Sequence, residues 1–187
     1  MRPAVTTPAP TSDEDLLRAF STGDEQAFAR FHARHHQRLV AYAWRLLGRR
    51  EEAEEVCADV FSQLARGRWK EGGSARAWVF TLTHRRCLDR LRRRSRWARV
   101  VPWLSSTPDP VHTPEHALAR TDRQRHLERA LSGLSEDHRA VILLYYGEEL
   151  SSREVADVLG CSDQQVRSRL AYARRLLRDA MPDSVEV

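Results

Sequence analysis

Two helix starts lie close together between residues 149 and 170, and this spacing constrains the fold more than any other feature of the chain. Ser151 with Glu154, and Ser162 with Gln165, have the spacing of capping boxes, in which paired side chains satisfy backbone donors at a helix N-terminus. We therefore predict a short helix, a tight turn and a second helix, which is the helix-turn-helix arrangement.

The residues around these two starts fit a DNA-reading helix-turn-helix. Gly160 falls in the predicted turn, and Ala156 is small where the two helices must approach each other. Apolar residues recur at helical spacing, and these are Val155, Ala156 and Leu159, then Val166, Leu170, Ala173 and Leu177. The candidate DNA contacts lie on the second predicted helix: Gln164, Gln165, Arg167, Ser168, Ala171, Tyr172 and Arg175. The alternative interpretation is a helical hairpin with a solvated basic face.

The charge of the chain is consistent with a polyanionic partner. The formal net charge is +5, and 30% of the residues are charged. Lys70 is the only lysine, so nearly all of the positive charge is arginine. Arginine forms paired hydrogen bonds with phosphates and guanine edges, although codon bias in a GC-rich genome also explains part of this composition.

Helical periodicity runs through most of the chain, and no alternating strand pattern occurs. The sequence therefore predicts an all-α protein of two small domains joined by a proline-containing linker. The expected segments are a flexible tail (1–11), an N-terminal domain (12–97), a linker (98–115), a C-terminal domain with the helix-turn-helix (116–181) and a tail (182–187).

The last helix predicted in the N-terminal domain starts at Ser74 and continues to about Arg96. Its expected buried residues are Ala77, Trp78, Leu82, Leu88 and Leu91. Its second half is strongly basic, with Arg85, Arg86, Arg90, Arg92, Arg93, Arg94, Arg96 and Arg99 beside Trp97 and Trp103. Arginines among aromatic residues are typical of single-stranded nucleic-acid binding, and a solvated helix end is the alternative.

The preceding predicted helix, residues 51–65, is acidic. The residues expected on its exposed side are Glu51, Glu52, Glu54, Glu55 and Asp59. In a net-basic chain this concentration of carboxylates indicates a basic partner protein, and solvated charge is the alternative.

No catalytic, metal or membrane motif stands out in the chain. Cys57, Cys87 and Cys161 are scattered and are expected to be reduced. His84 and Cys87 have no further ligands nearby, and His32, His35 and His36 are expected to be solvated or half-buried rather than metal-bound. We expect no cofactor, no enzymatic activity and no membrane insertion.

Four sequence runs, taken in order, resemble the extracytoplasmic-function (ECF) sigma factors of bacterial RNA polymerase. Residues 53–61 (AEEVCADVF) resemble the family's polymerase-docking helix, and residues 77–94 resemble its promoter-melting helix. Residues 134–144 and the helix-turn-helix ending at residues 166–170 (VRSRL) resemble its minus-thirty-five-reading domain.

The resemblance implies a cytoplasmic sigma factor that binds core RNA polymerase, recognises two promoter elements and opens the DNA. It assigns polymerase binding to Glu54, Glu55 and Asp59. It assigns the minus-ten element and the melted strand to Arg85, Arg86, Asp89, Arg92 and Arg93. An anti-sigma protein is a further expected partner. The alternative is a helix-turn-helix repressor or activator that is not a polymerase subunit.

The chain departs from the family pattern at several expected contacts. Arg85 replaces the usual asparagine, Ala58 the usual glutamine and Tyr172 a residue that is often basic, while a Gln164–Gln165 pair replaces glycine and threonine. We therefore expect this chain to have its own promoter preference.

Overall fold

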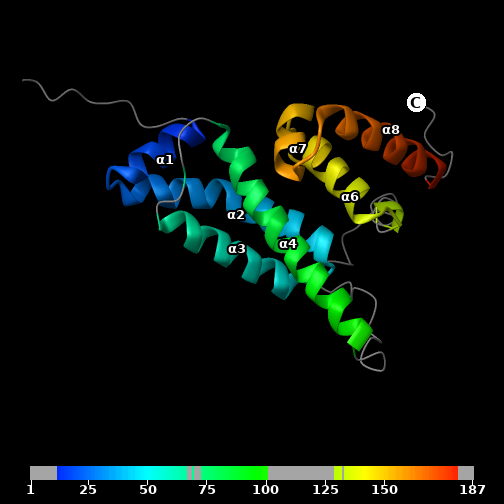
Figure 1. Cartoon of the computed structure of the whole chain (residues 1–187). Helices are drawn as coiled ribbons and strands as arrows, with labels where there is room; N and C mark the ends of the chain where they lie inside the picture. Colours follow the sequence, from blue (N-terminus) through cyan, green and yellow to red (C-terminus); the bar gives the residue numbers. More distant parts are fainter. Residues whose placement is uncertain (1–11, 67–68, 70–72, 101–128, 132, 181–187) are drawn as a thin grey trace, which may run out of the picture.

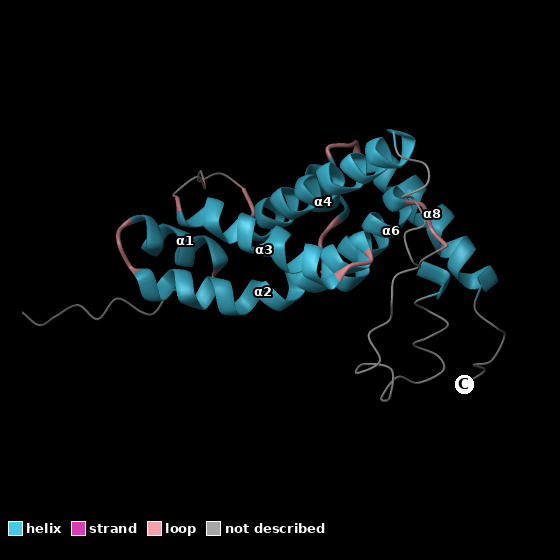
Figure 2. Ribbon diagram, turned by 90° about the horizontal axis from the view of Figure 1, so that it is seen from below, coloured by secondary structure: helices cyan, strands magenta, loops and turns pink. Residues whose placement is uncertain are grey.

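The computed structural model describes residues 12–66, 69, 73–100, 129–131 and 133–180. Helices joined by short loops make up this part of the chain, which contains no strand (Figures 1 and 2). The all-α prediction is confirmed. Most of the predicted linker, with Trp103, lies outside the described residues, as do the two predicted tails.

The first three helices lie next to one another in the N-terminal half (Figure 1). They are α1 (Asp13–Ser21), α2 (Glu25–Leu47) and α3 (Arg50–Ala65). The Ser12 hydroxyl accepts the backbone N–H of Asp15 at the start of α1, and the two residues are three positions apart, as in an N-cap. Gly48 ends α2 with a φ of 74°, a left-handed conformation that favours glycine.

Helix α2 contacts α1, α3 and α4 and contributes more buried residues than any other helix of this half. Phe31, Leu39 and Tyr42 are almost completely buried. His35 is also completely buried, so the expectation of a solvated or half-buried side chain is wrong for this histidine. Its Nε2 lies 2.8 Å from Oδ2 of Asp13, so the hydrogen bond to α1 offsets part of the cost of burying the ring, whose Nδ1 has no partner in the described part of the chain.

Helix α4 (Ala75–Val100) has a different buried side from the one predicted. Ala77 is buried, but Trp78, Leu82, Leu88 and Leu91 are only half-buried. The residues that it buries in addition are Ala75, Val79, Phe80, Thr83, His84 and Cys87. The reason is that α4 contacts α2 and α3 and also packs against α7 of the C-terminal half (Figure 1). Helices from both halves of the molecule therefore decide which side of α4 is buried. The helix extends to Val100, past the domain end predicted at residue 97.

The C-terminal half contains α6 (Glu136–Ile142), α7 (Ser152–Leu159) and α8 (Asp163–Ala180). Between α6 and α7 the chain forms a π-helical turn, η3 (Leu143–Gly147), which the sequence patterns do not predict. Glu149 follows this turn with a φ of 53°, a conformation that non-glycine residues rarely adopt.

The turn after η3 also connects the two halves of the molecule. Nε of Arg38 on α2 donates to Oε2 of Glu148 at 2.7 Å, and Arg76 on α4 donates to the backbone carbonyl of Glu149 at 3.4 Å. Arg139 on α6 donates to the carbonyl of Arg45 at 3.3 Å. Together with the packing of α7 on α4, these contacts hold the two halves against each other.

Candidate nucleic-acid interface

The helix-turn-helix has both of the predicted capping boxes. The Ser151 hydroxyl accepts the N–H of Glu154 at 3.2 Å, and the Glu154 carboxylate accepts the N–H of Ser151 at 2.9 Å. Ser162 and Gln165 form the same reciprocal pair at 3.2 and 2.8 Å. Gly160 ends α7 with a φ of 64°. The two capping boxes and the left-handed Gly160 therefore define the turn between the two helices, as the sequence predicts.

The buried faces of α7 and α8 agree with the prediction except at two positions. Val155, Ala156, Val166, Leu170 and Ala173 are buried, whereas Leu159 and Leu177 are half-buried, and Val158 takes the place of Leu159 in the core. Val155 and Leu159 lie one turn apart on the same helix, as predicted. Since α7 contacts α4, η3 and α8, its buried face is wider than one stripe and includes Val158.

The predicted contact residues on α8 are all exposed, namely Gln164, Gln165, Arg167, Ser168, Ala171, Tyr172 and Arg175. Two of them already form a hydrogen bond or an ion pair within the helix-turn-helix. Oε1 of Gln165 accepts the N–H of Ser162, which leaves its amide group as a donor. Arg167 lies 2.6 Å from Asp163, with 66% of its side chain exposed, so it is accessible for a competing contact.

Aromatic rings contact two arginines of α8, and the contacts that involve a second helix could not be read from helical periodicity. Arg175 lies over the ring of Tyr172, 5.2 Å from its centroid, and the other neighbour of this ring is His138 of α6. Arg174 donates to the Tyr146 hydroxyl and lies over the Tyr146 ring at 5.4 Å. Pairs that join residues on different helices depend on how the helices pack, so spacing within one helix does not reveal them.

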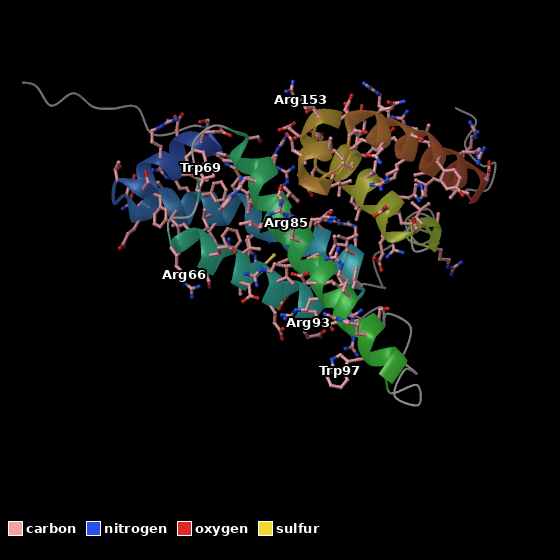
Figure 3. All side chains as sticks on the ribbon, viewed as in Figure 1. Arg66, Trp69, Arg85, Arg93, Trp97 and Arg153 are labelled. Carbon is pink, nitrogen blue, oxygen red and sulfur yellow. The ribbon has the colours of Figure 1, made fainter. Side chains whose placement is uncertain are left out.

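The predicted strand-binding residues form an exposed face on α4. Arg85, Arg86, Asp89, Arg92 and Arg93 are all exposed. Figure 3 shows Arg85 and Arg93 along this helix and Trp97 near its far end. The Trp97 side chain is the most exposed large apolar residue in the described part of the chain, at 69%. Arginines with a free aromatic ring provide both phosphate contacts and a stacking plane.

The acidic face of α3 lies beside this basic face and pairs with it. Glu54, Glu55 and Asp59 are exposed, as predicted. Glu55 accepts from Arg90 at 2.7 Å, which raises the pKa of Arg90, and Asp59 lies 3.8 Å from Arg86. Glu54 instead pairs with Arg50 on its own helix. Ion pairs therefore join the acidic face of α3 to the basic helix α4.

Glu52 differs from the other acidic residues of α3. It is half-buried rather than exposed, and its carboxylate lies 2.7 Å from Arg94 of α4 and 3.3 Å from Arg49. Burial acts to raise the pKa of Glu52, but the hydrogen bonds from Arg94 and Arg49 outweigh burial and lower it. Glu52 therefore joins α3 to α4 and is not part of the accessible acidic face.

Two of the three cysteines are buried and unreactive. Burial raises the pKa of Cys57 and of Cys87 to about 12, so both remain protonated thiols at neutral pH. Cys161 is half-buried in the turn of the helix-turn-helix, and all three thiols are free. Within the described ranges, no three His, Cys, Asp or Glu side chains are grouped in a way that could hold a metal ion. None of the helices described is both long and apolar enough to cross a membrane.

Comparison with known families matches both halves of the chain to parts of one protein class. The model for Sigma-70 region 2 matches residues 31–96, and the model for Sigma-70, region 4 matches residues 124–177. The first range includes α3 and most of α4, and the second includes α6, α7 and most of α8. These two matches assign the chain to the sigma factors.

Similar proteins narrow this class to one family. The ECF RNA polymerase sigma factor SigK of Mycolicibacterium vanbaalenii is 31% identical, and the alignment covers 93% of this chain and 92% of the relative. SigL of Mycobacterium tuberculosis, also an ECF sigma factor, is 35% identical over 75% of this chain and 80% of the relative. The chain belongs to the ECF sigma factors of RNA polymerase. A repressor or activator that acts without being a polymerase subunit is not favoured.

Solved structures support the fold. The sigma factor RpoE of Bartonella quintana, in complex with the anti-sigma factor NepR, has a TM-score of 0.73 at 22% identity and covers 84% of this chain and 98% of that one. CnrH, in complex with the cytosolic domain of CnrY, has a TM-score of 0.69 at 21% identity and covers 94% of this chain and all of that one.

Proposed function

We propose that this sigma factor divides its work among three surfaces. The α3 face with Glu54, Glu55 and Asp59 binds core RNA polymerase. The exposed face of α4 binds the minus-ten element and its melted strand through Arg85, Arg86, Asp89, Arg92 and Arg93. The exposed face of α8 reads the upstream element. The observation that carries this proposal is the pair of separate arginine-bearing helices, α4 and α8, one of which belongs to a doubly capped helix-turn-helix.

The first test is transcription initiation in a reconstituted system. The purified chain is mixed with core RNA polymerase and genomic promoter fragments, and transcript starts are mapped. Starts that require this chain are expected, with a shared sequence motif upstream. If the folded chain, free of any anti-sigma protein, produces no polymerase-dependent starts, the proposal fails.

The polymerase-binding face can be tested separately because its charges can be removed without adding new ones. Reversal of Glu55 would place a positive charge next to Arg90, so the better variant is Glu55→Gln combined with Asp59→Asn. We expect affinity for core polymerase to fall roughly tenfold. Glu51→Gln is the matched control, an exposed acid on the same helix outside the proposed site. Equal affinities for the variant and the control would contradict the docking assignment.

The upstream-reading face makes a different prediction. Arg167→Ala is expected to cost about 1–3 kcal/mol of promoter binding and to relax the sequence preference at one upstream position, because arginine can form a bidentate contact with guanine. The measurement is a binding assay of the holoenzyme against a promoter library randomised upstream. A uniform loss across all sequences would make Arg167 a phosphate contact instead.

We also propose an anti-sigma protein as a partner, by analogy with the complex of RpoE and NepR that shares this fold. The remaining parts of the proposal are that the chain acts in the cytoplasm, where polymerase and promoter DNA are found, and that it performs no catalytic step of its own.

A further inference from the structure

Tyr172 is the least expected residue on the reading face of α8. It is one of three large apolar side chains that are exposed in the described part of the chain, with 43% of its surface accessible. It lies one helical turn after Ser168 and one turn before Arg175, both exposed. The ring therefore occupies the centre of the face that we propose contacts the upstream element.

The Tyr172 ring is held by neighbours from two helices. The His138 ring of α6 packs against it, with 4.7 Å between the ring centroids and an interplanar angle of 39°. The guanidinium of Arg175 lies 5.2 Å from the centroid of the same ring. Aromatic and cation–π contacts of this kind restrict the rotamer of the tyrosine, so less conformational freedom is lost when it binds a ligand.

His138 is itself fixed in place. Its Nδ1 lies 2.6 Å from the Ser135 hydroxyl at the start of α6. The residue before it, Asp137, pairs at 2.7 Å with Arg169, which precedes Tyr172 by one turn on α8. The first turn of α6 is thus joined to the middle of α8 at two adjacent points. Helix α6, which lies outside the helix-turn-helix, therefore helps to fix the position of the Tyr172 ring.

We propose that His138 is a positioning residue that holds Tyr172 against the methyl group of a thymine in the upstream promoter element. The proposal rests on the function proposed above for α8. The ring of Tyr172 is apolar apart from the hydroxyl at its tip. The apolar group that a base pair presents in the major groove is the thymine methyl. A ring held by His138 and Arg175 selects for this methyl, whereas a mobile ring gains less from the contact.

The experiment uses the holoenzyme and one of its mapped promoters. Each thymine of the upstream element is replaced singly by deoxyuridine, which removes only the methyl group. With the wild-type chain, one replacement is expected to weaken binding about fourfold, the ratio that burial of one methyl group provides. With Tyr172→Ala this replacement is expected to have no effect. With His138→Ala its effect is reduced, and with His138→Phe, which keeps the ring contact, it is retained.

The controls separate positioning from folding. Circular dichroism melts establish that each variant is folded, and rescue by His138→Phe distinguishes the ring contact from a general loss of structure.

A full deoxyuridine effect in folded His138→Ala would overturn the positioning role. The absence of any sensitive thymine in the wild type would overturn the methyl contact while leaving promoter recognition intact. A uniform loss with Tyr172→Phe across all upstream sequences would make the tyrosine hydroxyl a phosphate contact and also overturn the proposal. Failure of the wild-type chain to initiate at all would overturn both this inference and the proposed function.

Discussion

His84 lies at the middle of α4 and is only 5% exposed. Its Nδ1 is 2.9 Å from the Tyr42 hydroxyl, which is completely enclosed in the core. Burial lowers the pKa of His84 from 6.5 to about 4, with Asp137 opposing this change and Arg169, Arg85 and Arg92 adding to it. The imidazole is therefore neutral in the folded protein at physiological pH, and the positive charge of the nearby arginines favours the same neutral form.

This buried histidine makes stability depend on pH. Because the pKa in the folded chain is below that in the unfolded chain, the unfolded chain binds a proton that the folded chain excludes between about pH 6.5 and 4. The free energy of unfolding is expected to decrease as pH is lowered through this window, by up to roughly 3 kcal/mol. Urea titrations at several pH values measure the slope.

The matched variants are His84→Gln and Thr83→Val. The first removes the buried titrating ring and should flatten the slope between pH 6.5 and 4, since glutamine does not titrate. The second changes the neighbouring buried side chain, which does not titrate, and should leave the slope unchanged. An unchanged slope in His84→Gln would assign the effect to another group.

At the scale of single elements, the capping box of α7 gives a direct prediction. Ser151→Ala removes the hydroxyl that accepts the Glu154 N–H, so the helix start loses one satisfied donor. We expect a loss of about 1 kcal/mol in the free energy of unfolding. Ser152→Ala, at the next residue, is the control and should change stability much less, because this serine is not the N-cap. Denaturant unfolding followed by circular dichroism compares the two, and equal losses would contradict the capping role.

The accuracy of the predictions at this scale depended on how local each feature is. The caps at Ser12, Ser151 and Ser162 were predictable because they involve residues three positions apart. The π-helical turn η3 was not predicted. It buries both Leu143 and Leu144, and it allows Leu150 to donate to the Leu144 carbonyl at 3.1 Å. Which residues of this turn become buried depends on the neighbouring helices, so an α-helical repeat does not reveal it.

At the scale of the whole molecule, the Arg38–Glu148 pair joins the two halves. Glu148 is 7% exposed, and burial raises its pKa even though Arg38 acts to lower it. Arg38→Ala would leave this carboxylate buried without its partner, at a cost of about 1–3 kcal/mol to the packed arrangement. We expect the radius of gyration, measured by small-angle X-ray scattering, to increase.

Arg34→Ala is the control for this prediction. Arg34 pairs with Asp13 at 2.6 Å, but both residues belong to the N-terminal half. Its removal should leave the radius of gyration unchanged. An equal radius in the Arg38 variant would show that the packing of α7 on α4 is sufficient to hold the halves together.

The packed arrangement also bears on promoter binding. The two elements named for positions minus-ten and minus-thirty-five are separated by roughly 25 base pairs, or about 85 Å along B-form DNA. Helix α7 of the helix-turn-helix packs directly on α4. The two halves are therefore expected to separate before both elements are bound, and Arg38→Ala should favour this separation.

The sequence alone determined the helices, their caps, the helix-turn-helix and the exposed charged faces, because each depends on residues a few positions apart. It also carried the resemblance to the ECF sigma factors, which the similarity to SigK and SigL confirms. Only the tertiary structure decided which side of α4 is buried, that His35 and His84 are enclosed, that the faces of α3 and α4 share ion pairs, and that His138 packs on Tyr172. These features involve residues that are distant in the chain. They depend on how the helices pack against one another, and the spacing of residues within one helix does not reveal this packing.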